Sequence, residues 1–404
     1  MMQKAKALDA ADPLAHLRDA FFLPEGVIYF DGNSLGAMPK AALAEVDETM
    51  QQEWARDQIT SWNKAGWFDL PTRYGDMLAP VIGAAPGEVV VCDSTSLNLF
   101  KALFAGLGLR PGRKVILAEA SSFPTDLYMI EGVLAARPGL EMQLAENLLE
   151  AIDERVAVVL LNHVDYRSGA LADVAAITAR AHEMGAVVIW DLCHSAGVMP
   201  VGLNAHRVDL AVGCSYKYLN GGPGSPAYIY CAKRHLPEVQ QPLSGWWGHE
   251  APFAFAPGFS PDAGIRKFLS GTQPILSFRA MQAGLALIAA QDMATLRAKS
   301  QSLTALFIEL VQARVPELEL ASPRAAQMRG SQVSFRHPEA YAIVQALISR
   351  GVIGDFRMPD LLRFGFSPLY LSHMDIVNAV QILHEIMADG LWKEPRFQAR
   401  QAVT

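Results

Sequence analysis

Two apolar runs that each lead into polar residues constrain the fold of this chain more than any other feature. Residues 186–190 are mostly β-branched and lead into Asp191, and residues 210–213 lead into a polar stretch that contains Lys217. Continuous apolar runs of this length are typical of strands buried on both faces of a parallel sheet. Because open α/β sheets bind ligands at the carboxyl ends of their strands, the sequence predicts that Asp191 and Lys217 meet at one site.

Lys217 and Asp191 together suit a pyridoxal phosphate enzyme. A lone lysine is usually a surface residue, but this one precedes a Gly-Gly-Pro-Gly turn at residues 221–224 that lets backbone approach closely. In such an enzyme the lysine amine forms a Schiff base with the cofactor, and a carboxylate keeps the pyridine nitrogen protonated so that the ring accepts electrons. The pair therefore indicates pyridoxal 5'-phosphate as the cofactor.

Around these residues the chain resembles the kynureninase family, a group of fold type I (aspartate-aminotransferase-like) pyridoxal phosphate enzymes. The resemblance covers nearly the whole chain through short motifs in the family's order: Gly32-Asn33-Ser34-Leu35-Gly36, Phe123-Pro124-Thr125-Asp126, Asp191-x-x-His194, Tyr216-Lys217, Gly245-Trp246-Trp247-Gly248-His249 and Arg363-x5-Leu369-Tyr370. Any one of these motifs is weak, whereas the ordered set is specific.

The resemblance implies an α/β fold with a large domain, built on a mostly parallel seven-stranded sheet, and a small C-terminal α/β domain. We expect residues 1–35 to pack with the small domain, residues 36–275 to form the large cofactor-binding domain and residues 276–404 to form the small domain. The sequence agrees with this division, because strand and helix patterns alternate as in βαβ units before Asp191, and one or two long helices without proline follow residue 277.

The resemblance also implies the cofactor contacts. Lys217, Tyr216 and Asp191 are the expected catalytic residues. Phe123 is expected to stack on the pyridine ring, which adds roughly 1 kcal/mol beyond the buried area. The other expected cofactor contacts are Thr95, Ser96, Thr125, Asp126, His194, Trp246 and Thr272. Thr95 and Ser96 begin a predicted helix whose free amides can bind a phosphate, although helix capping alone explains the same pattern.

The expected substrate-binding residues are Asn33, Trp67, Gly271 and Arg363. Arg363 lies in an apolar run, where a buried guanidinium needs a carboxylate partner. That partner is either a protein Asp or Glu or, as the family implies, the α-carboxylate of an amino acid. Trp67, Gly271 and Thr272 match three positions at which animal enzymes that favour 3-hydroxykynurenine carry His, Ser and Asn, so we expect this chain to favour kynurenine.

The implied function is hydrolysis of L-kynurenine at its Cβ–Cγ bond to anthranilate and L-alanine, a step of tryptophan catabolism in the kynurenine pathway, which also leads to NAD biosynthesis. The alternatives are an aminotransferase or cysteine desulfurase of the same superfamily, or a catalytically inactive binding protein with this fold. A desulfurase needs a nucleophilic cysteine in the C-terminal third, and the last cysteine here is Cys231. An inactive protein is disfavoured by the presence together of Asn33, Asp191, Tyr216, Lys217 and Arg363.

The composition limits the classes of binding partner and the cellular compartment that we expect for this chain. The net charge is -7, and the basic residues form no block, which argues against nucleic-acid binding. No apolar run approaches the ~18 residues of a membrane span, and the first thirty residues lack a signal-peptide pattern. The four cysteines show no C-x-x-C spacing and are expected to be reduced, so we expect a cytoplasmic protein.

Two further expectations concern metals and assembly. His163, His194 and Asp191 lack the spacing of a metal site, so no metal is expected. We expect a homodimer, both from the resemblance and because the aromatic segment 246–259 is more apolar than the rim of a single subunit.

Overall fold

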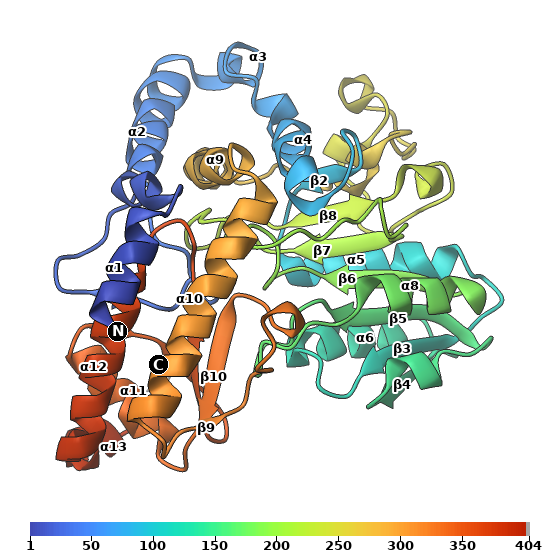
Figure 1. The fold of residues 1–404 in the computed structure, drawn as a ribbon. Helices are drawn as coiled ribbons and strands as arrows, with labels where there is room; N and C mark the ends of the chain where they lie inside the picture. The colour runs from blue at the N-terminus through green and yellow to red at the C-terminus, as the bar shows by residue number, and fades with distance from the viewer. Residues whose placement is uncertain (401–404) are drawn as a thin grey trace.

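Residues 1–400 are described by the computed structural model, and a seven-stranded sheet forms the centre of the larger part of the chain (Figure 1). Its order is β2-β8-β7-β6-β5-β3-β4, and neighbouring strands are parallel except at β8, which is antiparallel to both β7 and β2. The strands are β2 (Val89–Val91), β3 (Val115–Glu119), β4 (Glu141–Ala145), β5 (Val156–Asn162), β6 (Val187–Asp191), β7 (Leu210–Gly213) and β8 (Tyr228–Cys231). The predicted mostly parallel seven-stranded sheet is confirmed.

Helices cover both faces of this sheet, which explains why its central strands are apolar without interruption. Alternate residues of β5 and β6 belong to two separate cores, with Val159, Leu161, Val188 and Trp190 in one and Val158, Leu160, Val187 and Ile189 in the other. Helix α8 (Val174–Glu183) packs into the first core, and helices α5 (Thr95–Gly108) and α6 (Pro124–Ala136) pack into the second. Every polar residue at a strand end is therefore placed by apolar packing on both sides.

A smaller antiparallel sheet of four strands, in the order β12-β13-β10-β9, forms the C-terminal part. Its strands are β9 (Glu319–Leu320), β10 (Gln332–Arg336), β12 (Asp355–Arg357) and β13 (Leu361–Gly365). The chain enters this part through two consecutive helices, α9 (Ile275–Ala289) and α10 (Met293–Arg314). Helices α11 (Ala340–Ser349) and α12 (His373–Asp389) complete it, and β1 (Ile28–Tyr29) pairs in parallel with β11 (Val352–Ile353).

The first residues of the chain are tied to its last elements. Helix α1 (Met2–Ala10) lies beside α12 (Figure 1). Asp9 accepts hydrogen bonds from the backbone N–H groups of His373 (2.6 Å) and Met374 (3.0 Å), so it satisfies free amides at the start of α12. Close by, Asp12 and Lys299 form a buried ion pair at 2.7 Å.

The segment at residues 31–36 then crosses to the large sheet beside Lys217. Gly36 N–H donates to the carbonyl oxygen of Tyr216 at 2.7 Å. A Cβ atom at Gly36 would lie only 2.3 Å from the carbonyl oxygen of Lys217, so no larger residue fits at this contact. The glycine of this motif thus brings two chain segments together at the predicted site.

Several elements, among them α1, α4 (Leu70–Ile82) and β4, were not expected from the sequence. Strand β4 is the edge strand of the large sheet and is partly exposed, so it lacks the continuous apolar pattern of its neighbours. The remaining helices are α2 (Lys40–Glu48), which continues into π-helical turns at Thr49–Arg56, α3 (Ser61–Lys64), α7 (Leu148–Ala151) and α13 (Pro395–Gln398). Within residues 1–400, no helix has both the length and the apolar character needed to cross a membrane.

Candidate active site

A cavity of about 170 Å³ opens at the carboxyl ends of the central strands. It is lined by Thr95, Ser96, Leu99, Phe123, Thr125, Asp126, Asn162, Val164, Tyr166, Asp191, Cys193, His194, Tyr216 and Lys217. Every expected cofactor contact except Trp246 and Thr272 belongs to this set. The lining residues come from five separate strand ends and the segments that follow them, so only the folded sheet assembles them.

Backbone hydrogen bonds direct Lys217 into the cavity. The carbonyl oxygen of Tyr216 is held by Gly36, and that of Lys217 accepts from the N–H of Asn220 at 2.9 Å. Asn220 has a φ of 54°, which closes the loop tightly after the lysine. Lys217 Nζ lies 3.0 Å from His194 Nε2, and no carboxylate within residues 1–400 forms an ion pair with it. The amine is therefore available for chemistry.

Two carboxylates, Asp191 and Asp126, face the same cavity. Asp191 ends β6, and its Oδ1 accepts from the N–H of Cys193 at 2.6 Å. Asp126 lies in the first turn of α6. Burial, and next the nearby Asp191, raise the pKa of Asp126 well above its usual range. The neutral form of Asp126 is therefore favoured beside Asp191, and Asp191 at the end of β6 is the carboxylate that fits the expected partner of a ring nitrogen.

Asn162 positions two of the expected cofactor contacts, although the sequence analysis did not single it out. Its Oδ1 accepts from the N–H of Phe123 at 2.9 Å, and its Nδ2 donates to Asp126 Oδ2 at 2.8 Å. Asn162 ends β5 as Asp191 ends β6, so the same strand-end argument identifies it. The Phe123 ring meets the edge of Tyr166, with the ring centroids 5.1 Å apart, and remains part of the cavity wall.

The start of helix α5 forms the other end of the cavity. Thr95, Ser96 and Tyr216 line both the cavity and an adjoining hollow of about 410 Å³. The free amides and the positive end of a helix of 14 residues favour an anion at this position. A lysine amine, a strand-end carboxylate, an aromatic wall and a helix start thus lie around one space, and this set fits pyridoxal phosphate.

His194 is buried between Lys217 and Gln332. Burial lowers the pKa of His194 well below its usual range, and the charge of Lys217 is the second-largest cause. The ring is therefore neutral. Its Nδ1 lies 3.1 Å from Gln332 Oε1. His194 forms no hydrogen bond to Asp191 in the part of the chain that is described, so its direct contacts are to Lys217 and Gln332. Gln332 follows 138 positions later along the chain, and no sequence signal indicated it.

Arg363, on β13, is paired with a carboxylate of the protein itself. Its Nε donates to Asp355 Oδ1 at 2.7 Å, and its Nη2 donates to Asp355 Oδ2. The guanidinium also donates to Ser34 Oγ at 2.9 Å and to the carbonyl oxygen of Tyr166 at 2.7 Å. Of the two partners that the sequence left open, the protein carboxylate is present. Because Tyr166 lines the Lys217 cavity, Arg363 lies directly behind the cavity wall.

Besides Arg363, five expected site residues do not line this cavity. Asn33 is fully buried, and both atoms of its side-chain amide lack a hydrogen-bond partner in the described chain. Trp67 donates from Nε1 to a glutamate at 2.6 Å, and Trp246 packs in an aromatic cluster. Gly271 and Thr272 are exposed. One chain therefore does not bring these residues to Lys217.

Comparison with known proteins gives full-length relatives. The family described as "Kynureninase C-terminal domain" matches residues 296–383. The chain is 51% identical over 412 residues to the kynureninase of Burkholderia pseudomallei (strain K96243), a match that covers 100% of this chain and 99% of the relative. It is 52% identical over 408 residues to the kynureninase of Pseudomonas fluorescens, with 98% of each chain covered.

Solved structures share the fold at much lower identity. The apo cysteine desulfurase of Thermococcus onnurineus NA1 has a TM-score of 0.79 and 20% identity, covering 93% of this chain and 98% of that chain. A variant of C-DES with glycine covalently linked to its PLP cofactor has a TM-score of 0.79 and 18% identity, covering 91% of this chain and 99% of that chain. The implied fold class is therefore confirmed.

Proposed function

The chain belongs to the kynureninase family, and from this premise we propose that it hydrolyses L-kynurenine to anthranilate and L-alanine with pyridoxal 5'-phosphate as its cofactor. The observation that carries the proposal is 51% identity over the whole length of kynureninases. The Lys217 cavity supports it, because the lysine, Asp191 and the start of α5 fit the cofactor. The four cysteines of the chain are all unpaired and buried, which suits the reducing cytoplasm.

The structural resemblance to cysteine desulfurases does not extend to their chemistry. A desulfurase needs an accessible cysteine that can act as a nucleophile, whereas all four cysteines are buried. Cys193 lines the Lys217 cavity, but its contact with Cys214 and its burial raise the pKa of its thiol well above the usual range. Burial raises the pKa of Cys92 and of Cys231 to about 12, so neither forms a thiolate at neutral pH.

In this proposal the residues of the cavity divide the work of holding the cofactor. When bound, pyridoxal phosphate supplies an aldehyde that reacts with amines and a ring that accepts the electron pair of a bond at Cα. Asp191 holds a proton at the ring nitrogen, and Phe123 covers one face of the ring. Thr95, Ser96 and the amides of α5 bind the phosphate.

Lys217 and Tyr216 move protons in this proposal. Lys217 would hold the cofactor covalently and, once its amine is free, would remove the proton from Cα of the substrate. Burial raises the pKa of Tyr216, so its phenol stays protonated and can donate a proton when the Cβ–Cγ bond has broken. One water molecule is consumed at the ketone carbon, which becomes the carboxylate of anthranilate.

Arg363 is the residue proposed to bind the α-carboxylate of the substrate. Its N–H groups already donate to Asp355, Ser34 and the Tyr166 carbonyl, so only one of its five donors is free. A two-point grip on a carboxylate therefore requires that Ser34 or Tyr166 releases it. Asn33, whose amide has no partner, lies in the same segment as Ser34 and is proposed to contact the substrate as well.

Substrate choice is proposed to depend on Trp67, Gly271 and Thr272, which match the family's positions around the aromatic ring. An apolar wall leaves the extra hydroxyl of 3-hydroxykynurenine desolvated, at a cost of roughly 1–3 kcal/mol. We therefore propose a preference for kynurenine of about tenfold to a hundredfold in kcat/KM. Equal or reversed values for the two substrates would exclude this role.

A homodimer completes the site in this proposal. Trp246, Gly271 and Thr272 do not line their own chain's cavity, and we propose that a second copy supplies them. Two unpartnered apolar surfaces support this assembly. The first is the segment that carries Phe253 and Phe255, whose side chains are 65% and 82% exposed. A monomeric chain rarely exposes aromatic side chains to this extent.

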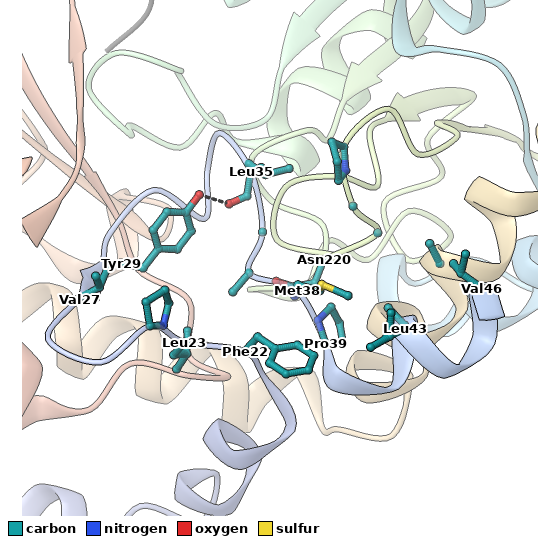
Figure 2. Close-up of a pocket in the computed structure, with 18 of the residues that line it drawn as sticks. Phe22, Leu23, Val27, Tyr29, Leu35, Met38, Pro39, Leu43, Val46 and Asn220 are labelled. Carbon is teal, nitrogen blue, oxygen red and sulfur yellow. Dashed lines mark hydrogen bonds between the residues drawn. The ribbon is translucent and has the colours of Figure 1, made fainter. Parts of the chain in front are cut away.

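The second surface is an apolar groove of about 640 Å³ between residues 22–46 and the loop after Lys217 (Figure 2). Figure 2 shows Phe22, Met38 and Leu43 along it. The groove is continuous with the site, because Leu35 and Pro223 line both the groove and the hollow beside Thr95. We propose that a second copy covers the groove.

The dimer is tested by sedimentation and turnover of Leu43→Glu, which places a charge in the groove. We expect a monomer with little activity. Leu149→Glu is the matched control, because Leu149 is also exposed but lies outside the groove, and it should remain dimeric. A fully active monomer contradicts the proposal.

The proposed reaction is tested by adding L-kynurenine to the purified protein loaded with pyridoxal phosphate. We expect anthranilate fluorescence to rise together with an equal amount of L-alanine. Lys217→Ala is the control for contaminating activity. Absence of anthranilate, or release of sulfide from cysteine, contradicts the proposed function.

A further inference from the structure

Gln332 connects the small antiparallel sheet to the Lys217 cavity without lining it. It is the first residue of β10, and its side chain is buried. Its Oε1 lies 3.1 Å from His194 Nδ1, and the other ring nitrogen, Nε2, lies 3.0 Å from Lys217 Nζ. Gln332 is therefore two contacts away from the reactive amine.

The side-chain amide of Gln332 can take only one orientation. Its Nε2 donates to the backbone carbonyl oxygens of Asp165 at 3.3 Å and Tyr166 at 3.1 Å. Carbonyl oxygens only accept, so a flipped amide would place Oε1 against two acceptors. Oε1 must therefore face His194, and it faces it as an acceptor.

This orientation decides which nitrogen of His194 carries the proton. An acceptor beside Nδ1 requires the proton to be on Nδ1. The cationic groups Lys217, Arg363 and Arg357 all act on the buried ring and disfavour a second proton. Nε2 thus keeps a free lone pair, which accepts a hydrogen bond from the Lys217 amine.

We propose that Gln332 is a positioning residue for Lys217, because it holds His194 in the tautomer whose Nε2 accepts from the lysine amine. The proposal rests on the proposed function of Lys217 and extends it to a residue of the small sheet. The same amide donates to two backbone carbonyl oxygens in the loop that follows β5. Arg363 donates to one of the two, the carbonyl oxygen of Tyr166. Gln332 therefore ties the orientation of the amine to the placement of the loop beside Arg363.

The first test reads the tautomer without turnover. Protein labelled with ¹⁵N-histidine, both free of cofactor and loaded with pyridoxal phosphate, is measured by long-range ¹H–¹⁵N correlation, and His194→Asn assigns the signals. We expect a protonated Nδ1 and an unprotonated Nε2 in the wild type, and loss of this pattern in Gln332→Leu. A wild-type ring protonated at Nε2, or an unchanged pattern in Gln332→Leu, overturns the proposal even if the protein turns over another substrate.

The second test separates positioning from general stability. Gln332→Leu should lower kcat by about tenfold to a hundredfold with little change in KM. Gln282→Leu is the matched control, because Gln282 also accepts a side-chain hydrogen bond, from Tyr74, but lies away from the cavity. Equal losses of kcat in the two variants contradict a positioning role.

Gln332→Glu provides a readout that a purely structural role does not move. The carboxylate still accepts from Nδ1, although it can no longer donate to the carbonyl oxygens of Asp165 and Tyr166, and its charge should raise the pKa of His194. The acidic limb of the kcat–pH profile should therefore move to higher pH in Gln332→Glu, whereas it should not do so in Gln332→Leu. An acidic limb that stays in place in Gln332→Glu contradicts the proposal.

Discussion

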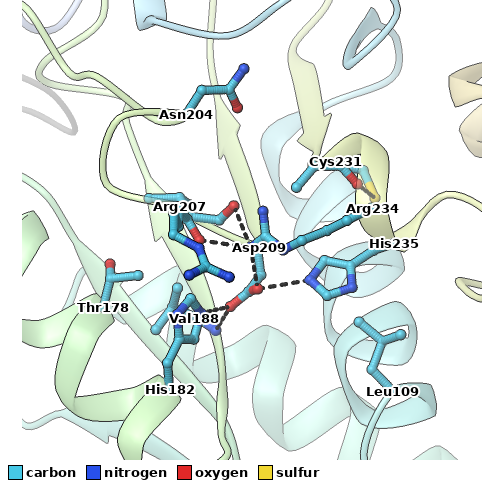
Figure 3. A network of polar contacts seen from close by, with 12 residues as sticks. Leu109, Thr178, His182, Val188, Asn204, Arg207, Asp209, Cys231, Arg234 and His235 are labelled. Atoms are coloured by element: carbon cyan, nitrogen blue, oxygen red, sulfur yellow. Dashed lines mark hydrogen bonds and ion pairs between the residues drawn. The ribbon is translucent and has the colours of Figure 1, made fainter.

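Two buried aspartates lie at opposite ends of neighbouring strands and have opposite surroundings. Asp209 precedes β7 at the amino end of the sheet, where its carboxylate accepts four hydrogen bonds (Figure 3). The donors are His182 Nε2 (2.9 Å), the N–H of Val188 (2.9 Å), Arg234 Nη2 (2.6 Å) and His235 Nε2 (2.7 Å). Asp191 ends β6 at the carboxyl end of the sheet. It accepts from a backbone N–H and faces another carboxyl group, Asp126.

The difference shows how one fold assigns one residue type to two tasks. Asp209 ties α8, β6 and the turn at Lys233–His235 together, and its partners compensate for the burial of its charge. Asp191 forms no ion pair with any arginine, lysine or histidine among residues 1–400, so its charge is poorly compensated by the protein alone. An uncompensated carboxylate in a cavity is typical of a binding site, because a ligand can complete it.

The largest effect is expected at the carboxyl end, on replacing Lys217. Lys217→Ala should lower turnover by about 10⁴-fold or more, because no other lysine lines the cavity. The melting temperature should stay close to that of the wild type. Borohydride reduction of the loaded protein followed by peptide mapping should label Lys217 alone. A label on another lysine, such as Lys114 or Lys233, contradicts the assignment.

Asp191→Asn should lower kcat/KM by about 10²- to 10⁴-fold, because the amide cannot hold a proton at the ring nitrogen. The cofactor-free protein should lose no stability, since the change removes a charge that faces Asp126. Steady-state kinetics and urea unfolding of the same preparation check both statements. A loss of stability with unchanged kcat/KM would mean that Asp191 has a structural role like that of Asp209, which contradicts the contrast between them.

Asp209→Asn should show the opposite pattern. The change leaves Arg234 and two histidines without a charged partner, so we expect the free energy of unfolding to fall by about 3 kcal/mol. The kcat value below the melting transition should stay within about twofold, because the carboxylate lies at the far end of the sheet. Urea unfolding and anthranilate production are the measurements, and a large loss of kcat in the folded variant contradicts the separation of roles.

The aspartates at the two ends of the large sheet should also differ in the sign of the pH dependence that they give to the free energy of unfolding. Burial on its own raises the pKa of a carboxyl, but at Asp209 hydrogen bonds from His182 and His235 outweigh burial and lower the pKa below its ordinary value. A lowered folded-state pKa gives stability that is present above the unfolded-state value, about 3.9, and is lost as the pH falls below it. Between about pH 4 and pH 2, Asp209→Asn should therefore lose less stability than the wild type.

The smallest effect on stability is expected at Asp126. Its pKa is raised, so the stability that it contributes changes with pH in the opposite direction to that of Asp209. A raised pKa gives stability that is present at low pH and lost as the pH rises through the folded-state value. Asp126→Asn should therefore make the cofactor-free protein about 1 kcal/mol more stable at neutral pH, because it removes the cost of burying two facing acids. Urea unfolding across the pH range tests this, and a variant that is less stable at pH 8 contradicts the account.

The sequence by itself determined the central strands of the large sheet and the residues at their ends. Apolar runs without alternation require strands covered on both faces, so the position of Asp191 at the end of its strand follows from local pattern alone. Lys217 was predicted in the same way, because it follows an apolar run and precedes a turn, whereas the roles of Thr95 and Phe123 were implied by the resemblance to the family. The family motifs, which occur in the family's order along the chain, indicated that these residues belong to one site. The full-length relatives confirm the family.

Only the tertiary structure decided the contacts that join distant parts of the chain. The partner of Arg363 was open in the sequence, because any buried carboxylate satisfies a guanidinium, and the pairing of β12 with β13 selects Asp355. Gln332 and His194 are 138 positions apart and meet because the small sheet packs against the loop after β5. Local patterns report burial and periodicity, whereas the choice of hydrogen-bond partner depends on which polar atoms the packed core brings within reach, and that is decided by the whole fold.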